Sequence, residues 1–212
     1  MTVGETSAPD RLRTAGVYVL ACGALARELT SIVSVNGLDR ITVEYLPARL
    51  HNTPDQIPAL VDERLTAAAA THAVRFVAYA DCGTGGLLDR VLERHGVERL
   101  PGAHCYEFFA GDLFHRLQDR EPGTFYLTDY LTRHFDRLVW EGLGIDRHPQ
   151  LRDMYFGNYR RLVYLSQAND PGLVIEATAA ADRLGLTFEH HHVGLGALEP
   201  AMVSITRRKD VA

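Results

Sequence analysis

Short apolar runs alternate with stretches of helical periodicity along most of this chain of 212 residues. Apolar runs of strand length that are rich in β-branched residues and separated by amphipathic stretches predict buried strands that alternate with helices. The predicted strands cover residues 16–21, 41–46, 74–80, 97–100, 161–166 and 186–193, and the predicted helices cover residues 24–35, 54–71, 85–95, 106–117, 128–141, 149–159 and 171–184. This order predicts an α/β fold with a mostly parallel, Rossmann-like sheet of at least five strands and helices on both faces.

The length of the chain suits one large α/β domain or two small ones, and the absence of a clear linker favours the first. We therefore expect residues 1–15 to form a flexible arm, residues 16–206 to form a single α/β domain and residues 207–212 to form a polar tail. Aromatic side chains gather between residues 120 and 160, and we expect this region to form a helical cap over the sheet.

Charge and hydropathy argue against several classes of partner. The chain carries 22 Lys and Arg against 27 Asp and Glu, a formal net charge of -5, whereas a nucleic-acid-binding face needs clustered basic residues. The apolar run from Val17 to Leu25 is too short to span a membrane, and the first sixteen residues lack the apolar segment of a signal peptide. Three widely spaced cysteines are not the disulfide framework of a secreted protein, so we expect a cytoplasmic protein that binds neither nucleic acid nor membranes.

All three cysteines follow predicted strands. Cys22 comes directly after the first strand, Cys82 after the strand that ends at residue 80, and Cys105 after the strand that ends at residue 100. Open α/β sheets bind ligands outside the carboxyl ends of their strands, so the sequence predicts that the three thiols converge there. Thiolates bind zinc and iron–sulfur clusters, and three protein ligands leave a fourth position for a substrate.

Two other interpretations of the cysteines stay open. Free cysteine is often a small buried hydrophobe, so the three thiols could be unrelated parts of the core. Alternatively, one thiol, Cys82, could be a nucleophile activated at a helix N-terminus.

Residues beside the cysteines are further candidates for the site. The glycine-rich segment from Cys82 to Gly86 leads into a predicted helix, where backbone N–H groups favour an anion, although a tight strand-to-helix turn fits equally well. A dinucleotide-binding fingerprint fails because Leu88 stands where its third glycine should be. The candidates for cofactor binding are Gly23, Gly83 and Gly85, and the candidates for a fourth metal ligand or for proton transfer are His51, Asn52, His104 and Glu107.

Three consecutive histidines, His190, His191 and His192, lie on the last predicted strand. Side chains alternate between the faces of a strand, so only His190 and His192 can share a ligand.

The sequence also resembles a prokaryotic family. The resemblance is carried by Ala21-Cys22-Gly23-Ala24-Leu25, Leu46-Pro47, Leu50-His51-Asn52, Tyr79 through Gly83 with Gly85, and His104-Cys105 followed by Gly123 through Thr128. Together these motifs resemble the family known as domain of unknown function 1638, over roughly residues 16–167. Its members are often encoded near corrinoid proteins and corrinoid-dependent methyltransferases, and the cysteines matching Cys22, Cys82 and Cys105 recur. Asp81 departs from the family, which more often has an apolar or small residue there.

The residues and the resemblance together predict a metal-binding enzyme. We expect Cys22, Cys82 and Cys105 to hold an iron–sulfur cluster or zinc. We expect the enzyme to act on a small molecule, in methyl or one-carbon metabolism as the resemblance implies. The alternatives are a non-catalytic accessory protein that binds metal, a corrinoid protein or a methyltransferase, and a metal-free α/β enzyme with a thiol nucleophile.

Overall fold

The structure, a computed structural model, describes residues 14–207. The predicted arm and tail therefore fall almost entirely outside the described residues, although Thr14 already belongs to the first strand and Arg207 ends the last helix. The chain divides into two compact units. The first unit runs to Pro101 and resumes at Pro200, and the second unit covers Gly102–Glu199.

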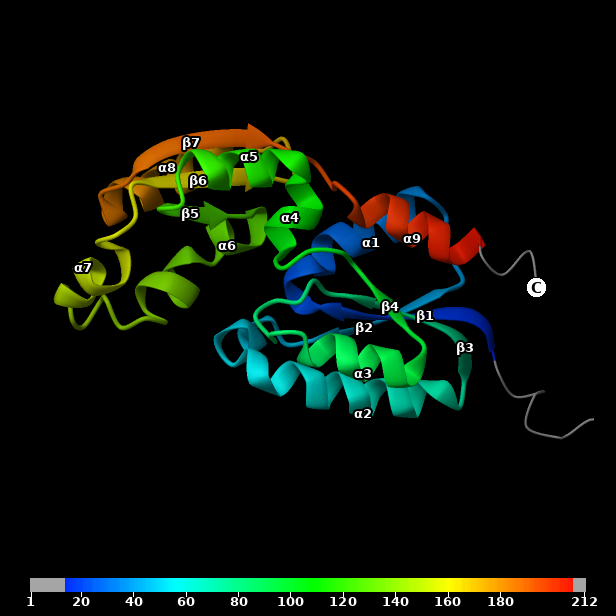
Figure 1. The fold of residues 1–212 in the computed structure, drawn as a ribbon. Helices are drawn as coiled ribbons and strands as arrows, with labels where there is room; N and C mark the ends of the chain where they lie inside the picture. Colours follow the sequence, from blue (N-terminus) through cyan, green and yellow to red (C-terminus); the bar gives the residue numbers. More distant parts are fainter. Residues whose placement is uncertain (1–13, 208–212) are drawn as a thin grey trace, which may run out of the picture. The chain divides into compact units, whose positions relative to one another are not determined.

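The first unit contains a four-stranded, all-parallel sheet in the order β2-β1-β3-β4. Its strands are β1 (Thr14–Cys22), β2 (Ile41–Leu46), β3 (His72–Ala78) and β4 (Glu98–Arg99). Helices α2 (Ile57–Ala69) and α3 (Leu87–His95) lie on one face, and α1 (Ala26–Val35) and α9 (Leu198–Arg207) lie on the other (Figure 1). Strand β1 is internal to the sheet and buried from Val17 to Cys22, which explains its unbroken apolar run.

Three short 3₁₀ turns connect elements of the first unit. They are η2 (Gly23–Leu25), η3 (Ala48–Asn52) and η4 (Pro54–Gln56). The first two follow β1 and β2 closely and so carry several of the predicted site residues at the carboxyl ends of these strands.

The second unit has a three-stranded parallel sheet in the order β5-β6-β7. Its elements are α4 (Cys105–Ala110), α5 (Asp112–Arg120), β5 (Thr124–Leu127), α6 (Asp129–Arg133), a π-helical turn (η5, Asp136–Trp140), α7 (Gln150–Phe156), β6 (Arg161–Ser166), α8 (Pro171–Leu184) and β7 (Thr187–His192). Alternate residues of the buried central strand β6 enter two cores: Leu162 and Tyr164 pack with α8, whereas Val163 and Leu165 pack with Leu117 of α5. Helices therefore cover both faces here too.

The predicted class, a parallel α/β fold with alternating helices, is confirmed. The expected single sheet of five or more strands is corrected, because the seven strands of the described residues form two sheets. The region expected to be a helical cap, residues 120–160, begins with a strand, β5, which pairs with β6. The predicted helix over residues 106–117 is interrupted at Gly111, whose positive φ of 54° ends α4.

Ion pairs between carboxylates and basic side chains tie α3 to its neighbours. Asp89 of α3 accepts two hydrogen bonds from the Arg99 guanidinium, at 2.5 and 2.9 Å, and this lowers the pKa of Asp89. The folded-state pKa lies below the unfolded value, so the pair stabilises the protein above that value, near 3.8, and the contribution is lost as the pH falls through the lower folded-state pKa.

We expect Asp89→Asn to lower the free energy of unfolding at pH 7 by less than about 1 kcal/mol, because Asp89 is half exposed and screened by solvent. The difference from the wild type should shrink below pH 3.8. Urea titrations at pH 7 and at pH 3 measure both values, and an equal difference at the two pH values would contradict this assignment.

Candidate functional site

The carboxyl end of the first sheet gathers several of the predicted site residues. Cys22 is the last residue of β1, and Cys82 follows the neighbouring strand β3 by four residues. The Cys22 Sγ lies 3.9 Å from the Nδ1 of His51 on η3. Gly83 lies beside Pro54 of η4, since a Cβ on Gly83 would stand 3.6 Å from the proline ring. The structure thus brings Cys22, His51, Cys82 and Gly83 to one end of this sheet.

Both thiols of the first unit are buried, and a tyrosine hydroxyl accompanies them. Burial raises the pKa of Cys22 to about 11. Burial, reinforced by the charge of Cys22, raises the pKa of Cys82 to about 12. The Tyr79 hydroxyl is buried without an oxygen or nitrogen hydrogen-bond partner, and its pKa is raised by burial and then by Cys22 and Cys82. Two buried thiols and one buried phenol therefore lie at this end of the sheet.

The loop after β3 has an unusual backbone. Cys82 has a φ of 51°, and it is the one non-glycine residue with positive φ within residues 14–207. Gly83, Gly85 and Gly86 also have positive φ, so this loop turns sharply in a conformation that glycine adopts without strain. A cysteine in the left-handed region is strained, and such strain often marks functional positions.

Asp81 organises this loop. Its carboxylate accepts hydrogen bonds from the Thr84 hydroxyl at 2.6 Å and from the backbone N–H groups of Gly85 and Gly86 at 3.0 and 2.9 Å. The pKa of Asp81 is lowered; burial raises it, and these hydrogen bonds more than offset that effect. The N–H groups that the sequence assigns to an external anion thus already bind a carboxylate of the same chain. The geometry matches the alternative of a tight strand-to-helix turn.

We expect Asp81→Ala to lower the free energy of unfolding by about 1–2 kcal/mol, because it leaves two loop amides and one hydroxyl without their acceptor. Chemical denaturation measures the change. Asp55→Ala, at an exposed position of η4, is the control and should change stability by less than about 0.5 kcal/mol. Equal values for the two variants would contradict the role of Asp81.

Gly23 has a packing role in the structure. A Cβ at Gly23 would stand 3.0 Å from the carbonyl oxygen of Leu46 and 3.4 Å from the backbone nitrogen of Ala48. The chain after β1 therefore passes closely against the chain after β2, and any larger residue would separate them. The assignment of Gly23 to cofactor binding stays a prediction. Asn52 is exposed at the end of η3, and its role as a metal ligand or proton-transfer group also stays a prediction.

The remaining predicted residues belong to the second unit. Cys105 is the first residue of α4 and is partly buried, and His104 precedes it. Glu107 accepts a hydrogen bond from the backbone N–H of Ala103 at 2.7 Å and lies 3.4 Å from the Nε2 of His115, so its carboxylate stabilises the start of α4. None of the three cysteines forms a disulfide. The participation of Cys105 with Cys22 and Cys82 stays a prediction.

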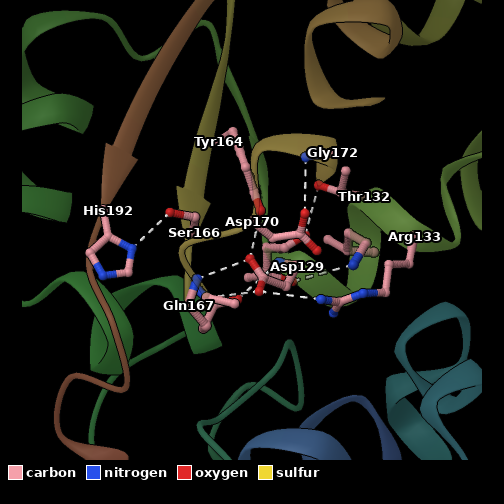
Figure 2. A network of polar contacts seen from close by, with 12 residues as sticks. Asp129, Thr132, Arg133, Tyr164, Ser166, Gln167, Asp170, Gly172 and His192 are labelled. Carbon is pink, nitrogen blue, oxygen red and sulfur yellow. Dashed lines mark hydrogen bonds and ion pairs between the residues drawn. The ribbon is translucent and has the colours of Figure 1, made fainter. Parts of the chain in front are cut away.

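The second unit has a buried polar network of its own, at the carboxyl ends of β5 and β6 (Figure 2). The Oδ1 of Asp129 accepts hydrogen bonds from the Tyr164 hydroxyl at 2.7 Å and the Gln167 N–H at 2.9 Å, and its Oδ2 accepts one from the Ala168 N–H at 2.9 Å. Arg133 lies 3.6 Å from the same Oδ2. This carboxylate, only 1% exposed, is fully satisfied and joins α6 to the end of β6.

The described part of the chain contains no group of three His, Cys, Asp or Glu side chains arranged to hold a metal ion. It also contains no helix that is both long and apolar enough to cross a membrane.

The protein is therefore a parallel α/β protein. Its candidate site is a pair of buried thiols at the carboxyl ends of two neighbouring strands. Over residues 45–202 the chain matches the family described as "Protein of unknown function (DUF1638)". The chain belongs to this family, which confirms the family that the sequence resembles, although the match does not include the motif from Ala21 to Leu25. No curated protein and no solved structure gives a significant match.

Neither Tyr79 nor Asp81 was predicted from the sequence to be a site residue, although both lie in a segment that carries the family resemblance. Tyr79 lies at the end of an apolar run, where a tyrosine is usually part of the core, and only the fold shows that its hydroxyl faces no oxygen or nitrogen partner. Asp81 carries a signal that could have found it, because an Asp three to five residues before Thr and Gly is typical of a side chain that caps a turn.

Proposed function

We propose that the protein is a metal-dependent enzyme in which Cys22 and Cys82, with Cys105 as a third ligand, hold an iron–sulfur cluster or a zinc ion. The observation that carries the proposal is the buried Tyr79 hydroxyl, which has no oxygen or nitrogen partner and faces the Cys22 thiol, with two buried thiols at neighbouring strand ends. A neutral thiol is a weak hydrogen-bond acceptor, and a metal-bound thiolate would accept the Tyr79 hydrogen bond more strongly. The proposed substrate is a small molecule of methyl or one-carbon metabolism, and the proposed compartment is the cytoplasm.

The donor set fits a thiophilic metal. Thiolate sulfur selects zinc and iron–sulfur clusters, and metal coordination deprotonates a thiol whose pKa burial would otherwise keep high. When bound, such a group supplies Lewis acidity to a molecule in the open coordination position. Tyr79 would donate its hydrogen bond to a ligating sulfur and so stabilise the thiolate form.

Burial argues against the metal-free alternative. A nucleophilic cysteine needs its thiolate stabilised by a nearby cation or a helix N-terminus. Burial, Cys22 and the Asp81 carboxylate disfavour a bare Cys82 thiolate, and together they outweigh the opposite effect of the Arg99 guanidinium on the pKa of Cys82. The loop amides at the start of α3 serve Asp81.

Metal analysis of anaerobically purified protein tests the proposal. We expect a near-stoichiometric amount of zinc, or of iron with acid-labile sulfide, and a loss of most of it in Cys22→Ser and in Cys82→Ser. The same loss in Cys105→Ser supports the third ligand, whereas full retention there excludes it. A wild-type protein without metal, or metal retained in all three variants, would overturn the proposal.

A matched pair of tyrosine variants sharpens this test. Tyr79→Phe removes the hydroxyl beside the thiols, and Tyr126→Phe removes another buried tyrosine hydroxyl, in the second unit. We expect only Tyr79→Phe to weaken metal binding, by about 10- to 100-fold. Equal affinities of the two variants would contradict the role of Tyr79.

Turnover separates the enzyme from an accessory protein. The probe is methylcobalamin, chosen because the family resemblance implies a corrinoid protein or methyltransferase as a partner. A change in its visible spectrum that depends on Cys22, on Cys82 and on an added thiol would support methyl transfer, in which the thiol sulfur takes the methyl group and the corrinoid leaves as cob(I)alamin. Binding of methylcobalamin without loss of its methyl group would support the accessory role instead.

A further inference from the structure

Two histidines of the edge strand β7 face the same hydroxyl group. The Ser166 Oγ lies 2.9 Å from the Nε2 of His190 and 3.1 Å from the Nδ1 of His192. Strand β7 lies at the edge of its sheet, next to β6, in a register that sets His192 opposite Ser166. Figure 2 shows the His192 ring turned toward Ser166. His191 points to the other face, where it lies 2.7 Å from Glu189.

The surroundings hold this histidine pair in place. The Tyr164 ring stacks on the His190 ring, with centroids 5.1 Å apart and planes 17° apart, and the Tyr164 hydroxyl is fixed by Asp129. Ser166 itself is only 1% exposed at the end of the buried strand β6. Supporting contacts of this kind orient imidazole ligands in metal sites.

The pair is also open to solvent. His190 and His192 are exposed, whereas Ser166 lies beneath them. A serine hydroxyl has a single proton, so it donates to one imidazole nitrogen and accepts from the other. Two ring nitrogens of exposed side chains thus converge within about 3 Å of one buried oxygen.

We propose that His190 and His192, supported by Ser166, form a binding site for a divalent transition-metal ion of the zinc class. Imidazole is the commonest metal ligand in proteins and suits zinc, copper and nickel. Within residues 14–207 no third His, Cys, Asp or Glu completes a closed cage, so water or a small anion fills the remaining positions. The site is independent of the thiols of the proposed enzyme.

Zinc titration of chelator-treated, full-length protein tests this site, with Zn²⁺ alone as the probe. We expect His190→Ala and His192→Ala each to bind zinc at this site with an affinity at least tenfold lower than that of the wild type. His191→Ala is the matched control and should keep the affinity within twofold, since its side chain is on the opposite face. Ser166→Ala should weaken binding less than either histidine variant.

Histidine NMR resonances separate this site from zinc bound by cysteines. We expect Zn²⁺ to shift the ring resonances of His190 and His192 and to leave that of His191 in place. Zinc should also raise the unfolding temperature of the wild type and of His191→Ala more than that of His190→Ala and His192→Ala, and a cooperative unfolding transition in the last two variants shows that they still fold. Unshifted resonances, or equal affinities in the three histidine variants, would overturn the proposal.

Discussion

Replacing Asp129 with alanine is expected to lower the free energy of unfolding by about 3–5 kcal/mol, because it removes one partner from a buried, charged network. The Tyr164 hydroxyl and the N–H groups of Gln167 and Ala168 would lose their acceptor, and Arg133 would lose its counter-charge. A loss of this size is a large share of the 5–15 kcal/mol that stabilise a typical domain. Urea denaturation followed by circular dichroism measures it.

Asp170 provides the control for this experiment. Its side chain caps α8 by accepting a hydrogen bond from the N–H of Gly172 at 2.9 Å, and it is exposed (Figure 2). Asp170→Ala should therefore cost about 1 kcal/mol, the usual value for a helix cap. If Asp129→Ala costs no more than Asp170→Ala, the buried network does not stabilise the second unit as described.

Gly196→Ala is the second change for which we expect a large effect. A Cβ at Gly196 would overlap the backbone carbonyl oxygens of Phe108 and Phe109, and its φ of 50° already disfavours any L-residue with a side chain. The close approach is fixed by the hydrogen bond from the Ala197 N–H to the Phe108 carbonyl at 2.7 Å. We expect a loss of about 2–6 kcal/mol, since conformational strain and overlap each cost about 1–3 kcal/mol.

Gly194→Ala separates the two contributions. Gly194 has a φ of 60°, but a Cβ there would meet no atom within 4 Å. We expect this variant to lose only the conformational part, about 1 kcal/mol. Denaturation curves of both variants give the comparison, and equal losses would show that overlap with Phe108 and Phe109 contributes nothing.

The sequence predicts some elements of this fold to the residue and misses others for physical reasons. Strands β2 and β6 and helix α8 have the predicted bounds, because apolar runs with clear turn or capping residues define them locally. Strand β5 has only four residues and lacks a long apolar run, so it escaped detection. The division into two sheets depends on which distant strands pair, and no local pattern contains that information.

The candidate site shows the same contrast. The rule that loops meet at the carboxyl ends of parallel strands agrees with the approach of His51 to Cys22 and of Pro54 to Gly83. The rule does not reveal which hydrogen-bond donors already have an acceptor within the chain. For that reason an external anion remained one interpretation of the backbone N–H groups in the loop after β3, which Asp81 binds. Hydrogen-bond partners depend on side-chain positions at the scale of 1 Å, which residue spacing does not determine.

The division of the chain also has a consequence for biosynthesis. The first unit is interrupted at Pro101 and resumes only at Pro200, where helix α9 buries Met202 and Ile205. At about 5–20 residues per second, a ribosome needs roughly 5–20 s to make the intervening second unit, which is continuous in the chain. During that interval the first unit lacks α9, so the first unit is completed only after the whole second unit has been made.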